Sequence, residues 1–252
     1  MTLTERGRGF TLVELLVVVA LVSLLLALLT PSLRRSKHLA RLAICGSGQK
    51  QYVYACGVYA GSQRGFFPRF DGNGCKAGHS RGNNLWDVDY CVYEHLRYRL
   101  GVPHEAFFCP FTTTDHAGDD FLTVGWKRYG FALLTYSYWV PRQLNCGLGP
   151  PDLDAPGNFR IIDTEPFRGP AGMADEMVSR NAMLTDAIIT PDSLGPTAPL
   201  SEDSTIHAPT FKLHLYGGRL DRINHAFADG SVRLVEPRDV RARFMGNWWN
   251  WK

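Results

Sequence analysis

A long apolar run near the N-terminus constrains this chain more than any other feature. Residues 15–29 contain no charged side chain and a single hydroxyl, that of Ser23. Extended to residues 10–33, the segment is 24 residues long. A helix rises about 1.5 Å per residue, so a segment of this length spans the roughly 30 Å hydrocarbon layer of a bilayer. We therefore expect a membrane-spanning helix at 10–33.

A cleavable secretory signal is the nearest alternative, because Arg6 and Arg8 form a basic segment before the apolar run. The apolar run is longer than the core of such a signal, however. The small residue at which a peptidase would cut, Gly9, stands before the run and not after it. This order favours an anchor that stays attached to the chain.

One carboxylate, Glu14, lies near the front of the apolar run. A charged side chain inside a bilayer costs about 2.5–3.5 kcal/mol on insertion scales, so it is expected to have a partner or a function.

The stretch RGFTLVE at 8–14, followed by the apolar run and Pro31, resembles the class III signal of type IV pilins and type II secretion pseudopilins. The resemblance implies that a prepilin peptidase cuts between Gly9 and Phe10, removes the leader 1–9 and methylates the new N-terminus. It also implies that the α-amino group of Phe10 meets Glu14 of a neighbouring subunit in a filament. Pro31 would be the place where the helix bends or loosens during assembly, or would mark only the membrane exit.

This resemblance sets the expected location and partners. It implies a single-pass inner-membrane protein with its head in the periplasm or outside, which enters a filament after processing. Its partners would be prepilin peptidase, other pilin or pseudopilin subunits and an inner-membrane assembly platform. The net charge of +3 is spread along the chain, so no nucleic-acid partner is expected. The sequence leaves open a pilus or a pseudopilus, a major or a minor subunit, and any cargo or surface ligand.

After the anchor, residues 34–60 are predicted to continue as a helix that enters a globular head at 61–252. Apolar residues recur there at spacings that fit one helical face: Leu39, Leu42, Ala43, Tyr52, Ala55, Cys56 and Tyr59. Gly46 and Gly48 weaken this helix locally. The segment 40–68 also resembles part of a pilin-like group abundant in planctomycete-type bacteria.

The stretch INHAFADGSVRLV at 223–235 alternates apolar residues around Asp229 and Gly230, which predicts a hairpin with a type I′ turn. It resembles the prepilin-associated domain defined by a histidine, nine residues and Asp-Gly, although Arg219 occupies the histidine position. From this resemblance we expect only a structural turn at Asp229 and Gly230, and no role for a histidine.

Further candidate strands are 129–140, 181–188 and 211–216. The expected fold is α+β and pilin-like: a long N-terminal helix, transmembrane in front and amphipathic behind, packed on an antiparallel β-sheet head.

No metal site is expected from the cysteines and histidines. The six cysteines would lie in an oxidising compartment, where disulfides persist, but the sequence does not choose their pairing. No Cys-x-x-Cys occurs, and His207, His214 and His225 are too loosely spaced to indicate zinc. Asp115, Asp119 and Asp120 could ligate Ca²⁺ through oxygen, but a solvated acidic loop is the preferred interpretation.

An enzyme is not expected, because no hydrolase elbow, phosphate loop, metalloprotease or dinucleotide motif occurs. An acid–base site would have to come from Asp186, His214, His225 and Asp229. A second alternative is a membrane-anchored surface binding module that uses a pilin-type signal and presents Trp248, Trp249 and Trp251 to a ligand.

Overall fold

The structure is a computed structural model. It describes residues 11–68, 87–111, 131–140, 160–161, 172–175, 178–191, 214–240, 242–245 and 248–251. The chain divides into two compact units, Met1–Ala40 and Arg41–Lys252, and helix α1 belongs to both. The unit that begins at Arg41 contains the rear of α1 and the strands, and is called the head below.

Helix α1, Leu12–Ser62, is a single α-helix that includes Pro31. It does not end at Pro31. It also runs without interruption through Gly46 and Gly48, where the sequence predicted local weakening.

The head contains short strands and a few turns of helix. The strands are β1 Asp87–Asp89, β2 Phe131–Leu133, β3 Tyr136–Tyr138, β4 Arg160–Ile161, β5 Leu184–Asp186, β6 Ile189–Pro191, β7 Leu215–Tyr216, β8 Arg219–Leu220, β9 Ile223–Ala226, β10 Val232–Val235, β11 Ala242–Met245 and β12 Trp248–Trp251. The helical turns are α2 Tyr90–Glu94, η1 His95–Arg99, η2 His104–Phe107 and η9 Pro237–Asp239.

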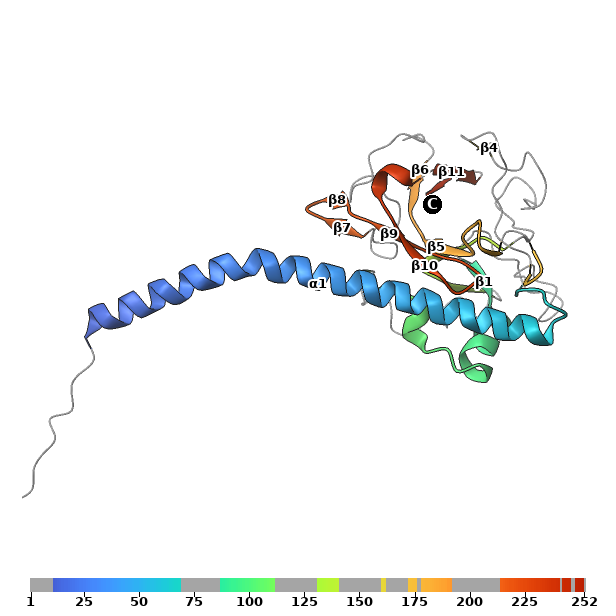
Figure 1. Cartoon of the computed structure of the whole chain (residues 1–252), viewed down its shortest axis with the longest axis horizontal. Coiled ribbons are helices and arrows are strands. Elements are labelled where there is room, and N and C mark those ends of the chain that lie inside the picture. The colour runs from blue at the N-terminus through green and yellow to red at the C-terminus, as the bar shows by residue number, and fades with distance from the viewer. Residues whose placement is uncertain are drawn as a thin grey trace, which may run out of the picture. The chain divides into compact units, whose positions relative to one another are not determined.

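The central sheet of the head has the strand order β10-β9-β5-β3, and its neighbouring strands are antiparallel. A second sheet has the order β4-β11-β12-β6, and two strand pairs, β1-β2 and β7-β8, complete the described set. Figure 1 shows the central sheet alongside the rear of α1. The expected α+β fold, a long N-terminal helix and an antiparallel sheet head, is confirmed.

The rear of α1 contributes one stripe of side chains to the core of the head. The buried members at helical spacing are Leu42, Cys45, Gln49, Tyr52, Val53, Cys56 and Ala60. Tyr52 makes edge-on ring contacts with Phe107 and Tyr138, which tie the helix to η2 and β3. The predicted face was partly wrong, because Leu39 and Ala43 are exposed.

Close packing explains two of the glycines in α1, Gly46 and Gly48. A Cβ at Gly46 would lie 3.1 Å from Oδ1 of Asn224, and one at Gly48 would lie 3.3 Å from the hydroxyl of Tyr136. Asn224 is on β9 and Tyr136 is on β3, so the glycines let the helix backbone approach the central sheet. The side-chain amide of Asn224 donates a hydrogen bond of 3.3 Å to the carbonyl of Leu42, and this bond stabilises the contact.

The predicted hairpin is present, but the type I′ turn is wrong. β9 and β10 pair with Ala226 opposite Val232, and the amide of Gly230 donates to the carbonyl of Phe227. Gly230 has a φ of +84°, whereas Asp229 is not among the residues with positive φ. A type I′ turn needs positive φ at both central residues, so this is a longer loop with glycine at the left-handed position.

The other predicted strands are shorter than expected. Residues 129–140 contain β2 and β3, residues 181–188 contain β5, and residues 211–216 contain β7. Of these, β3 and β5 lie in the central sheet and are buried along their whole length.

Candidate functional site

The N-terminus of α1 is closed by a capping box formed by Thr11 and Glu14. The hydroxyl of Thr11 accepts from the amide of Glu14 at 3.2 Å, and Oε2 of Glu14 accepts from the amide of Thr11 at 2.8 Å. The Thr11 hydroxyl also donates to Oε2 at 2.8 Å. Two backbone N–H groups that the first helical turn leaves unpaired are thereby satisfied. Glu14 thus has a partner within its own chain, which the sequence interpretation did not include.

The front of α1 is apolar on every side and exposed. Among the described residues, α1 is the helix that is long and apolar enough to cross a membrane, and no part of its most apolar stretch is buried. Side chains around the whole circumference are exposed, Leu24, Leu25 and Leu26 by 59% each. A helix that is apolar all round fits a lipid environment or a helix bundle. These features indicate membrane anchoring.

Pro31 lies in this apolar helix next to a hydroxyl that bonds back to the preceding turn. Pro31 has no N–H to donate to the carbonyl four residues earlier. The hydroxyl of Thr30 donates to the carbonyl of Leu26 at 2.7 Å. Such bonds are tolerated in membrane helices and often accompany a bend.

Several predicted site residues lie outside the described part of the chain. They are the cleavage residues Gly9 and Phe10 and the calcium candidates Asp115, Asp119 and Asp120. The backbone of Trp248, Trp249 and Trp251 is described in β12, but their side chains are not. The turn residues Asp229 and Gly230 connect β9 and β10, and Ser231 donates its amide to Oδ1 of Asp229 at 2.7 Å.

The head also contains a compact group of polar side chains that spacing along the sequence did not reveal. Cys45 on α1, Cys109 after η2, Asp186 at the end of β5 and His214 before β7 place one potential ligand atom each within 4.8 Å of one another. All four residues are buried, with exposed fractions from 0% for Cys45 to 4% for Asp186. We call them the buried Cys-His-Asp cluster.

Hydrogen bonds orient each member of the cluster. Sγ of Cys109 lies 2.9 Å from Nε2 of His214, and Nδ1 of His214 lies 2.8 Å from the carbonyl oxygen of Arg222. Because that carbonyl can only accept, Nδ1 carries a proton. Sγ of Cys45 donates to Oδ1 of Asp186 at 3.0 Å.

Asp186 is held from the helix side and from the sheet side. Its Oδ1 accepts from the amide group of Gln49 at 2.8 Å, and its Oδ2 accepts from the backbone N–H of Asn224 at 2.7 Å. Nδ1 of His214 lies 3.3 Å from the same Oδ2. A buried carboxylate needs such partners, because burying it without them would be costly.

Burial and mutual charge shift the pKa values of the cluster. Burial raises the pKa of the Cys45 thiol well above its usual range and also raises the pKa of Cys109. Burial alone would lower the pKa of His214, but the Asp186 carboxylate, Cys45 and the Arg222 carbonyl together raise that pKa to about 9. Without a bound cation, these shifts favour neutral thiols at Cys45 and Cys109 and a protonated His214.

Cys109, His214 and Asp186 have the contacts of a nucleophile, a base and an orienting carboxylate. A reactive cysteine, however, needs a lowered pKa and access to substrate. Here burial raises the thiol pKa, and Cys109 is only 3% exposed. Of the residues considered for an acid–base site, Asp186 and His214 do meet, whereas Asp229 is exposed in its turn and His225 lies half-buried on β9. The arrangement does not support catalysis.

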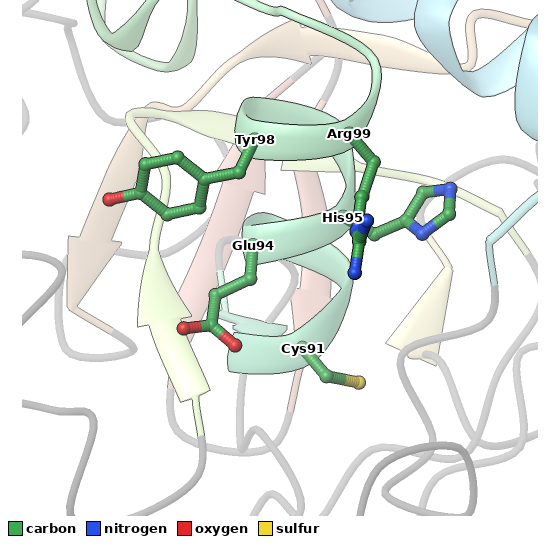
Figure 2. A pocket seen from close by; sticks show the side chains of 5 residues that line it. All are labelled: Cys91, Glu94, His95, Tyr98 and Arg99. Atoms are coloured by element: carbon green, nitrogen blue, oxygen red, sulfur yellow. The ribbon is translucent and has the colours of Figure 1, made fainter.

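A shallow hollow of about 290 Å³ lies on α2 and η1, and Figure 2 shows its lining residues Cys91, Glu94, His95, Tyr98 and Arg99. They come from successive turns of one helical segment, so they share a surface and do not enclose a ligand. None of the buried Cys-His-Asp cluster lines this hollow. Cys91 is disulfide-bonded and has no free thiol to offer.

Comparison with known proteins supports the N-terminal segment as the functional site. Residues 6–30 match the family model described as the prokaryotic N-terminal methylation motif. No curated protein and no solved structure matches the chain. The matched segment contains Gly9, Phe10 and Glu14, and ends just before Pro31. The chain therefore carries a segment similar to a pilin-type signal for processing and assembly.

Proposed function

We propose that this chain is a prepilin-like structural subunit that prepilin peptidase processes and that assembles into a type IV pilus or a type II secretion pseudopilus. The match of residues 6–30 to the N-terminal methylation motif carries this proposal. The exposed apolar helix that follows supports it, because a subunit of this kind needs a helix that rests in the membrane and later packs among other helices.

In this proposal the leader 1–9 is removed between Gly9 and Phe10, and the new N-terminus is methylated. Before assembly, the mature chain is a single-pass protein of the inner membrane, with its head on the periplasmic side. Its partners are other pilin or pseudopilin subunits and the assembly platform. The head serves as a structural part and not as an enzyme.

Glu14 has two successive tasks in this proposal. In the isolated chain its carboxylate caps the helix by accepting from Thr11. Both bonds use Oε2, so Oε1 can meet the α-amino group of Phe10 in a neighbouring subunit. Helix packing in a filament removes water from this pair, which makes its attraction stronger than that of a surface ion pair.

Three variants separate the two tasks. Glu14→Gln keeps a side chain that can complete a capping box but removes the charge, whereas Glu14→Ala removes both. Thr11→Ala removes the capping hydroxyl and keeps the charge. The fraction of chain crosslinked into multimers is measured in cells that contain the peptidase and the assembly machinery, with cleavage followed by mass.

We expect all three variants to be inserted and cleaved. Both Glu14 variants should lose multimers at least about tenfold, whereas Thr11→Ala should assemble at a near-normal level. Normal assembly of Glu14→Gln would show that the charge is not used between subunits. Normal assembly of both Glu14 variants would overturn the assembly role of this residue.

A further inference from the structure

We propose that the buried Cys-His-Asp cluster is a structural metal site for a zinc-class divalent cation, with Cys45, Cys109, His214 and Asp186 as its four ligands. This departs from the expectation of no metal site, which rested on spacing along the sequence. The four residues come from four separate segments of the head, and only the fold brings them together.

The donor atoms match zinc in kind and in number. Structural zinc sites are closed and tetrahedral, and use thiolate sulfur, imidazole nitrogen and carboxylate oxygen. With zinc–sulfur distances of about 2.3 Å and zinc–nitrogen distances of about 2.0–2.1 Å, neighbouring ligand atoms lie roughly 3–4 Å apart. The cluster atoms lie within 4.8 Å of one another, so small side-chain movements suffice to surround an ion.

The surroundings already orient the ligands as a metal site requires. The proton on Nδ1 of His214 is held by the carbonyl of Arg222, so Nε2 is the nitrogen that faces Cys109 and would bind the ion. Oδ2 of Asp186 accepts from the backbone N–H of Asn224, whereas Oδ1 is oriented by the side-chain amide of Gln49 and lies next to Cys45. Oδ1 is therefore the ligand atom in this proposal.

The change in charge on binding can be accommodated. Coordination requires both sulfur atoms and Nε2 of His214 to be free of protons, so binding releases any proton that they hold. The two thiolates neutralise the ion, and one negative charge remains on Asp186. The positive charge of the Arg41 guanidinium acts to lower the pKa of Cys109 and so favours its thiolate form. Arg41 can therefore compensate part of the remaining negative charge.

A metal here would link the rear of α1 to other segments of the head. Cys45 is on the helix, Asp186 is on β5 of the central sheet, and Cys109 and His214 are on two further segments. The competing outcome is a disulfide between Cys45 and Cys109, which are not joined by one in this structure. A disulfide would involve neither His214 nor Asp186, and it would not explain why Nε2 of His214 faces Cys109.

The test uses the full-length chain, extracted in detergent under anaerobic conditions without chelator. Metal content is measured by elemental analysis and by intact mass under native conditions. We expect about one zinc ion per chain. After removal of the metal, Co²⁺ titration should give the thiolate charge-transfer and tetrahedral absorption bands in a one-to-one complex.

Variants then locate the site. We expect the metal to be lost in three variants: Cys45→Ala, Cys109→Ala and His214→Gln. Gln49→Leu removes a hydrogen bond to Asp186 and should lower the affinity for the metal about 10–100-fold. The matched control is Cys56→Ala, because Cys56 is also a free, fully buried thiol on α1 but is not in the cluster. It should keep the metal and the cobalt bands.

Three results would overturn the proposal. One is a chain without metal in which peptide mapping finds Cys45 linked to Cys109 by a disulfide. Another is the absence of cobalt charge-transfer bands from reduced wild-type protein, an experiment that needs no variant to fold. The third is equal loss of metal in Cys56→Ala and Cys109→Ala.

Discussion

At the scale of single residues, the turn between β9 and β10 is the clearest case of one residue type being required. Gly230 has a φ of +84°, which side chains other than glycine rarely adopt. A Cβ at this position would also lie 2.6 Å from Cε1 of Tyr54 on α1. The Asp-Gly pair therefore both reverses the chain and lets the hairpin lie against the helix.

We predict that Gly230→Ala lowers the free energy of unfolding of the head by about 1–3 kcal/mol. Gly57→Ala is the control, because Gly57 is in α1 with nothing within 4 Å of its added Cβ. The control should raise stability by up to about 1 kcal/mol. Urea unfolding in detergent measures both, and equal effects of the two substitutions would contradict this account.

The carboxyl group of Asp229 makes the stability of the head depend on pH through the same turn. Burial is the largest single influence and raises the pKa of its carboxyl, but hydrogen bonding from Ser231 and the charge of Arg233 together outweigh it and lower the pKa below its usual range. The stabilisation is therefore fully present above the ordinary pKa near 4, and is lost as the pH falls through the lower folded-state pKa.

Asp229→Asn should accordingly be less stable than the wild type at neutral pH, and the difference should shrink as the pH falls below about 4. Urea midpoints measured across this range test the prediction. A difference that stays constant or widens on acidification would show that the charge of Asp229 is not involved.

At the scale of elements, the contact between α1 and the central sheet depends on small residues in the helix. Gly48 would place a Cβ 3.4 Å from the Cα of Ala106 and 3.3 Å from the hydroxyl of Tyr136. Neither the backbone near Ala106 nor the buried Tyr136 ring can move far, because both lie in the core of the head.

We predict that Gly48→Leu destabilises the head by about 1–3 kcal/mol through overpacking, although leucine is the better helix former. Gly57→Leu introduces the same side chain where space is open, and should be neutral or stabilising. Thermal unfolding followed by circular dichroism compares the two. Similar melting temperatures for both variants would contradict close packing at Gly48.

Sequence patterns predicted the elements that depend on neighbouring residues. They did not predict contacts between residues that lie far apart along the chain. The apolar helix, the hairpin around Asp229 and the antiparallel sheet follow from patterns that neighbouring residues show. The exposure of Ala43 was missed, because the direction of the buried stripe on the rear of α1 depends on where the sheet lies. The Cys45–His214 neighbourhood was missed because its members are separated by up to 169 positions, from 45 to 214, and spacing along the chain carries no information about their meeting.

At the scale of the whole molecule, the two units have different surroundings in our proposal. The front of α1 exposes apolar side chains on all sides, and the head buries its apolar and polar groups around the rear of the same helix. A subunit that leaves the membrane for a filament needs a front that exchanges lipid for neighbouring helices, and a head that remains folded during the exchange.

The most direct test of this account is the intact mass and N-terminal sequence of the chain extracted from membranes of cells with and without prepilin peptidase. We predict an N-terminus at Phe10 that carries one added methyl group in cells with the peptidase, and the uncut chain, beginning before Gly9, in cells without it. An N-terminus that does not depend on the peptidase, or a cut within or after the apolar run, would contradict the proposed function.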